Sequence, residues 1–316
     1  MTLARTGVTL LVMVAACSSD STGPSSGPST SNPTTSPFTI SVRYVDRTPP
    51  SPAVIDAFNR AVAKWQTVIV DSLGSVRVRL AAGACDSSQP ALDESVKDLL
   101  VLVHVRRITD TVPGQAILGE SGPCVVSDPD NLPVLGVMSL NSSTLTALAN
   151  NGLLDDVIEH EMAHLLGFGT IWDLDRVLQD TTTDDPWFSG PDAQAAFRKA
   201  LPDYNDKIVP VEAGGGSGTT LSHWRESVMT NELMTGFLDP GPNPLSAVTI
   251  ESMADLGYTV NLGAADPWPT TGSGMSAEVA RKRGASDSAA PTPHTALHGP
   301  RFRVLRSGVL LPLSAR

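Results

Sequence analysis

One stretch of thirteen residues constrains this chain more than any other, the segment VIEHEMAHLLGFG at residues 157–169. It contains the pattern His160-Glu161-x-x-His164. On an α-helix, residues four positions apart leave the same face about 6 Å apart, so both imidazoles can reach one tetrahedral zinc ion. Glu161 lies next to the first histidine, where its carboxylate can accept a proton from a zinc-activated water.

The residues around this motif favour a true helix over a chance match on an ordinary amphipathic segment. Asp155 and Asp156 fall in its first turn, where the helix dipole favours negative charge. Gly167 follows the motif, where a left-handed stop is expected. An apolar stripe at helical spacing precedes the histidines, at Leu153, Leu154, Val157 and Ile158. We therefore predict a helix that carries a catalytic zinc site.

The N-terminus is typical of an export signal. Arg5 precedes an apolar run that is too short to span a bilayer. We predict a signal peptide over residues 1–16, because Val14-Ala15-Ala16-Cys17 resembles the lipobox of bacterial lipoproteins. That resemblance implies cleavage before Cys17, lipidation of this cysteine and a membrane anchor on the periplasmic or extracellular side. The alternative is a plain secretory signal with an incidental cysteine, which also predicts export.

Composition divides the remainder into three parts. Residues 17–37 are almost wholly Ser, Thr, Pro and Gly, so we predict a flexible tether. Residues 38–270 hold the periodic apolar sequence and form the predicted folded domain. Residues 271–316 mix Ser, Ala, Pro and Arg without a clear period, so we predict a low-complexity, disordered tail.

The net charge and the cysteine content limit the functions and the kinds of site that this chain can have. The net charge of −11 argues against nucleic-acid binding, because phosphate neutralisation needs a basic surface. Cys85 and Cys124 lie in the predicted domain. In an oxidising compartment such a pair more often forms a disulfide than a metal site, although one thiolate could instead block the zinc in a latent form.

Hydrophobic periodicity predicts an α/β arrangement in which a sheet is backed by two long helices. The first helix begins at Pro52, and the second is the zinc helix. Strands are predicted over residues 38–44, 76–80, 99–103 and 134–140, with a Gly- and Pro-rich loop around Cys124. Beyond Gly169 the pattern becomes irregular, with short helices over 192–201 and from Thr249.

A catalytic zinc ion needs a third protein ligand and an open position for water. Of the remaining histidines, His104 lies in an apolar strand and is typical of a satisfied core residue. His294 and His298 lie among prolines in the tail, which leaves His223 as the candidate imidazole. A carboxylate from the segment after the helix is the alternative. The candidates are Asp173, Asp175, Asp184, Asp185 and Glu226.

The position of Gly167, three residues after His164, resembles the metzincin zinc peptidases, in which the chain turns sharply under the metal. Most metzincins place a third histidine where this chain has Thr170. Leishmanolysin-type metzincins place it after an insertion, as His223 is placed here. The resemblance covers roughly residues 134–262. Its further segments are Ser222-His223-Trp224, Asn231 to Gly236, and Ser246 to Tyr258.

These segments are similar to the leishmanolysin third-ligand segment, its Met-turn and the helix that follows. The resemblance implies that His160, His164 and His223 hold Zn²⁺, that Glu161 is the general base, and that Met234 forms the hydrophobic floor below the metal.

The resemblance also implies a metzincin-like α/β (α+β) fold. Its twisted, mostly parallel sheet and two long helices would form an N-terminal subdomain, residues 38–167. Residues 168–270 would form an irregular C-terminal subdomain with the Met-turn and a short helix. Relative to leishmanolysin, we expect neither a cysteine-rich C-terminal region nor a propeptide, since only the tether separates Cys17 from Phe38.

The implied activity is that of a monomeric, zinc-dependent endopeptidase acting on protein or peptide. The strand Val134 to Leu140, if exposed beside the zinc helix, would hold substrate by backbone pairing. Tyr258 is available as a second oxyanion donor, although nothing in the sequence indicates that role. The alternative is a non-catalytic surface lipoprotein that binds zinc or a partner, but such a site has no need of Glu161. A cell-wall amidase with the same zinc chemistry is a third hypothesis.

Overall fold

The computed structural model describes residues 37–109, 117–204, 208–216, 218–269, 296–297 and 299–313. The predicted signal peptide, Cys17, the tether up to residue 36, and His294 and His298 lie outside this part. The described residues all belong to one compact unit. The predicted subdomain boundary after Gly167 therefore stays a prediction.

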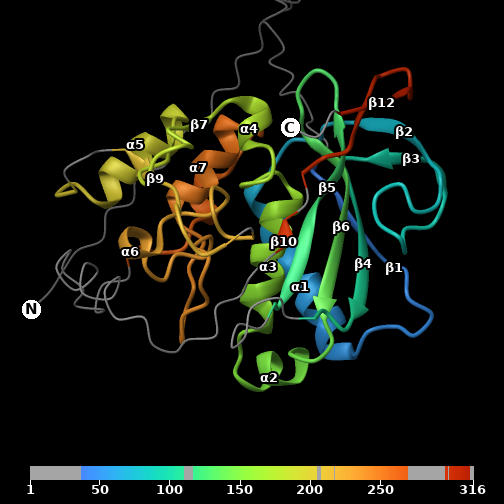
Figure 1. Cartoon of the computed structure of the whole chain (residues 1–316), viewed down its shortest axis with the longest axis horizontal. Helices are drawn as coiled ribbons and strands as arrows, with labels where there is room; N and C mark the ends of the chain where they lie inside the picture. The colour runs from blue at the N-terminus through green and yellow to red at the C-terminus, as the bar shows by residue number, and fades with distance from the viewer. Residues whose placement is uncertain are drawn as a thin grey trace, which may run out of the picture. The chain divides into compact units, whose positions relative to one another are not determined.

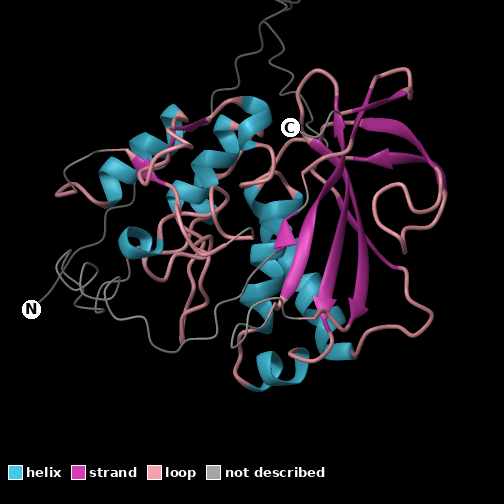
Figure 2. Cartoon of the chain, viewed as in Figure 1, coloured by secondary structure: helices cyan, strands magenta, loops and turns pink. Residues whose placement is uncertain are grey.

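A seven-stranded, mostly parallel sheet forms the main layer of the described chain (Figures 1 and 2). Its order is β1-β4-β6-β5-β11-β12, and β10 also pairs with β5. Strand β5 is antiparallel to β6 and β12 is antiparallel to β11, whereas the other pairs are parallel. The strands are β1 (Ile40–Tyr44), β4 (Leu99–Arg106), β5 (Gly119–Ser127), β6 (Pro133–Asn141), β10 (Ala296–Leu297), β11 (Phe302–Val304) and β12 (Leu310–Pro312).

The continuous apolar sequence of β4 follows from burial on both of its faces. Leu99, Val101 and Val103 pack into the core shared with helices α1 (Pro52–Val68) and α3 (Leu154–Leu165). Leu100 and Leu102 pack into a second core with β2 (Ser75–Leu80) and β3 (Leu92–Lys97). Successive side chains of a strand point to opposite faces, so both faces of the sheet are covered.

The two long helices lie together on one face of the sheet (Figure 1). The buried stripe of α1 includes Phe58 and Trp65. The indole N–H of Trp65 donates to the carbonyl of Glu159, 3.0 Å away, which joins α1 to the zinc helix α3. Asp155 and Asp156 occupy the first turn of α3, as its sequence indicates.

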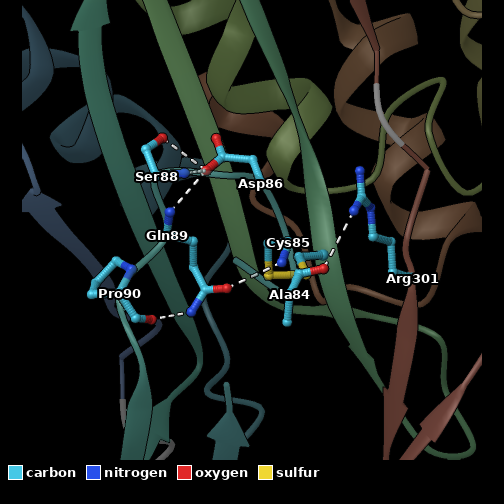
Figure 3. The surroundings of a disulfide bond; sticks show 8 residues. Ala84, Cys85, Asp86, Ser88, Gln89, Pro90 and Arg301 are labelled. Atoms are coloured by element: carbon cyan, nitrogen blue, oxygen red, sulfur yellow. Dashed lines mark hydrogen bonds between the residues drawn. A yellow bond between two sulfur atoms is a disulfide. The ribbon is translucent and has the colours of Figure 1, made fainter. Parts of the chain in front are cut away.

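The segment around Cys124, expected to be a loop, is strand β5, so that expectation is wrong. Its glycines and Pro123 hide the strand pattern, and its register with β6 shifts between Pro123 and Val126. Cys124 forms a disulfide with Cys85 that joins β5 to the loop before β3 (Figure 3).

Two further expectations are corrected by the sheet. Val134–Leu140 is not an exposed strand, because it belongs to β6, which pairs with β4 on one side and with β5 on the other. Within the predicted disordered tail, residues 302–304 and 310–312 form β11 and β12. The sequence conceals these short strands because their order comes from pairing with β5 and with each other.

The irregular half is built from short elements joined by loops. They are α4 (Trp172–Asp175), β7 (Leu178–Gln179), β8 (Trp187–Phe188), α5 (Pro191–Ala200), β9 (Val209–Pro210), α6 (Glu226–Met229), α7 (Ala247–Asp255) and a 3₁₀ turn (Leu262–Ala264). The short helix α2 (Leu145–Asn150) lies earlier in the chain, between β6 and α3. Strands β7, β8 and β9 form a small sheet of their own. Among the described residues, no helix combines the length and apolar character needed to cross a bilayer.

Candidate metal centre

Three histidines converge on one point beside the main sheet. Helix α3 carries His160 and His164, and His223 lies in the loop between β9 and α6. The Nε2 atoms of His160 and His164 are 3.0 Å apart, and each lies 3.1 Å from Nε2 of His223. In the described part of the chain, no other group of His, Cys, Asp or Glu places three ligand atoms within the range that one ion requires.

The tautomer of each imidazole follows from its second nitrogen. Every Nδ1 faces a backbone carbonyl, which can only accept, so Nδ1 carries the hydrogen and Nε2 presents its lone pair. The pairs are His160 with Leu233 (2.7 Å), His164 with Phe168 (2.8 Å) and His223 with Thr219 (3.2 Å). Nδ1 of His223 also lies 3.1 Å from the hydroxyl of Ser222, which can accept its hydrogen as well. Three lone pairs about 3 Å apart repel one another unless a cation lies between them. This donor set therefore fits a metal ion, and the carbonyls supply the orientation that metal-binding histidines need.

Burial keeps the imidazoles of His160 and His164 in the neutral form that can bind a metal ion. It lowers the pKa of His160 to about 4, against the smaller opposing effect of the Leu233 carbonyl. The pKa of His164 is lowered well below its usual value, first by burial and then by its two histidine neighbours. Both rings are accordingly uncharged at pH 7, with a lone pair available for a cation.

Two glycines in the turn after α3 allow His223 to approach His160 and His164. Gly167 has φ of +113°, which reverses the chain at the end of the helix. Gly169 has φ of +69°, and a Cβ there would lie 2.2 Å from the carbonyl oxygen of Ser222. The turn can thus touch the backbone directly before His223. Thr170 donates to the carbonyl of His164, 2.8 Å away, and so caps the helix.

Aromatic rings also pack against the segment that contains His223. The ring of Trp224, the residue after His223, lies 4.9 Å from that of Phe168 and 5.1 Å from that of Trp172 between centroids. The backbone N–H of Trp224 donates to the carbonyl of Met234, 3.0 Å away. His223 is thereby placed between the turn after the zinc helix and the turn that contains Met234.

The turn at residues 231–236, which the resemblance identifies as a Met-turn, contacts the centre through its backbone. The carbonyl of Leu233 accepts the Nδ1 hydrogen of His160, and the Met234 side chain is fully buried. The sequence assigned no role to Glu232, yet its carboxylate is 0 % exposed and organises this turn. It accepts hydrogen bonds from Thr249 Oγ1 (2.5 Å), Met234 N (2.6 Å), Ser246 Oγ (2.7 Å) and Ser246 N (3.1 Å).

Glu232→Ala is expected to lower the free energy of unfolding by about 3 kcal/mol, because it leaves several buried donors without their acceptor. Burial raises the pKa of Glu232, and the hydrogen bonds to its carboxylate oppose that rise only in part. Urea unfolding measures the change. Glu251→Ala, on the partly exposed face of α7, is the matched control and should change stability by less than about 0.5 kcal/mol.

Glu161 is only 2 % exposed and is held by a strand residue that the sequence did not single out. Ser121 of β5 donates from Oγ to Oε2 of Glu161 at 2.5 Å, and the same hydroxyl lies 3.1 Å from the backbone carbonyl of Glu161. The contact joins residues forty positions apart. No local pattern could have indicated it, since β5 itself was expected to be a loop.

The comparison with known families shows which family this chain belongs to. The family model described as leishmanolysin, Peptidase_M8, matches residues 94–286, which is more than half of the chain and includes all three histidines. The chain belongs to the leishmanolysin family. The curated relatives include a leishmanolysin homolog from Crithidia fasciculata, 29 % identical over 155 residues, and leishmanolysin from Leishmania donovani, 28 % identical over 168 residues.

These alignments cover 47 % and 50 % of this leishmanolysin-family chain, but only 23 % and 28 % of the two relatives. The chain thus matches about a quarter of the length of each relative. The residues matched by the family model, 94–286, include the histidine cluster. Peptidases of this family are zinc-dependent, and His160, His164 and His223 could hold that metal.

The rival carboxylates of this leishmanolysin-family protein do not join the histidine cluster. Asp175 accepts a hydrogen bond from Asn131 at 2.7 Å, and Asp185 pairs with Arg225 at 2.5 Å. Tyr258, considered as an oxyanion donor, is buried and donates to the carbonyl of Leu166, 2.9 Å away. It therefore packs behind the zinc helix and has a structural role.

His104 belongs to a separate row of hydrogen bonds with Asp46 (3.2 Å) and Ser88 (3.0 Å). This order resembles a Ser-His-Asp triad, but the donors an oxyanion would need are already used. The backbone N–H groups of Ser88 and Gln89 donate to Asp86 Oδ1, at 2.8 and 2.9 Å, and the Ser88 hydroxyl also lies 2.8 Å from it. We infer that these hydrogen bonds have a structural role and join the loop that contains Ser88 to strand β4.

Proposed function

We propose that the chain is a zinc-dependent endopeptidase that hydrolyses protein or peptide bonds, with Glu161 as the general base. One observation carries the proposal: three imidazoles direct their Nε2 atoms at one point in a chain of a zinc-dependent peptidase family. The buried carboxylate of Glu161 belongs to the same helix. Export and a lipid anchor at Cys17, and the monomeric state, are parts of this proposal that rest on sequence alone.

In the proposed mechanism, His160, His164 and His223 would hold a zinc ion, which would supply Lewis acidity and make water a better nucleophile at neutral pH. Glu161 accepts the proton of the attacking water and then delivers it to the leaving amine. The low exposure of the carboxylate excludes competing solvent and strengthens these charge interactions. The carbonyls of Leu233, Phe168 and Thr219 keep the three rings in place during turnover.

Strand β5, rather than β6, is our candidate for the strand that aligns substrate. It packs against α3, and its inner edge pairs with β6. Its outer edge pairs with residues of the C-terminal segment: Ala296 and Leu297 lie opposite Glu120 and Ser121. Beyond them, Phe302–Val304 pair with residues 125–127. A substrate strand that adds to this edge must therefore displace β10.

Replacing both residues of β10 by proline, Ala296→Pro/Leu297→Pro, is expected to raise kcat/KM for long peptides about tenfold. Proline cannot donate a backbone hydrogen bond, and each lost bond is worth about 0.5–1.5 kcal/mol. Initial rates on a fluorogenic peptide measure the change. The control Ala296→Val/Leu297→Val keeps both N–H groups and should retain the wild-type rate. An unchanged kcat/KM in the proline variant would contradict the assignment of this edge to substrate.

The proposed function is tested by incubating the purified protein with casein, with and without a zinc chelator. We expect fragments to accumulate, chelation to stop their formation, and added Zn²⁺ to restore it. A protein that binds zinc but leaves casein intact would instead support the non-catalytic lipoprotein. Activity on peptidoglycan without activity on casein would support an amidase.

A further inference from the structure

We propose that Ser121, together with Gly119, is a positioning residue that fixes the orientation of the Glu161 carboxylate. The inference rests on the proposed role of Glu161 as general base. Ser121 is 0 % exposed, and its hydroxyl lies 2.5 Å from Oε2 of Glu161. A hydrogen bond to a charged carboxylate is among the stronger ones in proteins, and this one is shielded from water.

Gly119 bounds the same carboxylate on a second side. A Cβ at Gly119 would lie 2.9 Å from Oε1 of Glu161 and 3.0 Å from its Cδ, closer than ordinary contact allows. Gly119 and Ser121 are two positions apart in β5, so both face α3, the helix that carries Glu161. The strand therefore limits the carboxylate by a hydrogen bond at one oxygen and by close packing at the other.

This restraint has a physical consequence for proton transfer. The terminal torsion of a glutamate side chain is broad and roughly two-fold, so an unrestrained carboxylate samples many orientations. Catalytic groups lose efficiency when their geometry is not held close to the reactive arrangement. The Ser121 hydroxyl also lies 3.1 Å from the backbone carbonyl of Glu161, but its single hydrogen is donated to the closer oxygen, Oε2 at 2.5 Å.

The main test is Ser121→Ala. We expect kcat to fall about 10- to 100-fold, the range that corresponds to one hydrogen bond to a charged group, while KM and zinc content stay unchanged. A second readout does not depend on turnover. Calorimetry should show about tenfold weaker binding of acetohydroxamate, a bidentate zinc ligand whose hydroxyl can donate to a carboxylate beside the metal.

The matched control is Ser139→Ala. Ser139 is an equally buried serine of neighbouring β6, and its hydroxyl accepts from Arg106 at 3.0 Å instead of contacting Glu161. We expect this control to keep its kcat and its affinity for acetohydroxamate. An equal loss in both variants would mean that sheet packing is responsible and would overturn the proposal, as would an unchanged kcat and affinity in Ser121→Ala.

Gly119→Ala keeps the proposal testable if Ser121→Ala does not fold. Its methyl group should displace the Glu161 carboxylate and lower kcat at full zinc occupancy. Wild-type kcat in this variant would then overturn the proposal. Adding Ser121→Ala to Glu161→Gln should cause no further loss, because both act through one carboxylate. Full activity in Glu161→Gln would reject the general base itself, whereas an inactive Glu161→Gln with a fully active Ser121→Ala rejects only the role of Ser121.

Discussion

Glu161→Gln is expected to lower kcat for peptide hydrolysis by about 10³-fold or more and to leave zinc bound. Glutamine has the same shape as glutamate but cannot accept a proton at neutral pH, and general-base catalysis typically contributes 10²–10⁴-fold. The three imidazoles and the carbonyls that orient them are untouched by this change. The rate should therefore fall although the metal site persists.

The measurement pairs casein hydrolysis with zinc content determined by mass spectrometry on the same preparation. Glu159→Gln is the control, because it makes the same substitution on the same helix, two residues away. Burial raises the pKa of Glu159 to about 7, and its charged neighbours are Lys64 and acidic residues rather than the histidine cluster. This control should keep both zinc and activity. A Glu161→Gln variant that hydrolyses casein at the wild-type rate would contradict the proposed mechanism.

His223→Ala is expected to weaken zinc binding by about 10²- to 10³-fold and to abolish hydrolysis. Four-ligand structural zinc sites bind with roughly 10–16 kcal/mol, so each ligand contributes about 3–4 kcal/mol. Without His223, the ion would keep only the two ligands of α3. Competition with a fluorescent zinc chelator measures the affinity.

His104→Ala is the matched control for the loss of a buried imidazole. His104 contacts Asp46 and Ser88 away from the cluster, so its removal should reduce stability but not zinc affinity. Stoichiometric, tightly bound zinc in His223→Ala would show that another residue supplies the third ligand. Asp173, which lies in the pocket beside Gly169 and Ser222, would then be the first residue to test.

The fold could be predicted in outline wherever local periodicity is strong. The alternation at the start of the domain, the stripe of α1 and the apolar run of β4 each became the expected element, because their burial is regular. Strand β5 was missed because Gly119, Gly122 and Pro123 remove the alternation and its register is irregular. The short strands β11 and β12 have too few residues to form a pattern of their own.

The sequence by itself determined the part of the candidate centre that lies on one helix, namely His160, Glu161 and His164. Once residues 154–165 form a helix, the spacing of His160 and His164 places both imidazoles on one face, because the helical repeat is a property of the backbone. His223, 59 residues further on, could be chosen over the rival carboxylates only through the family resemblance.

Only the tertiary structure decided which distant residues meet this helix. Gly169 lets the backbone at Ser222 approach, Glu232 ties the Met234 turn to α7, and Ser121 reaches the carboxylate of Glu161 from a strand. Each of these contacts joins residues that are distant along the chain. The hydrophobic periodicity of the sequence does not reveal such contacts, because they form only when separate elements pack together. The polar groups that this packing buries must then find hydrogen-bond partners.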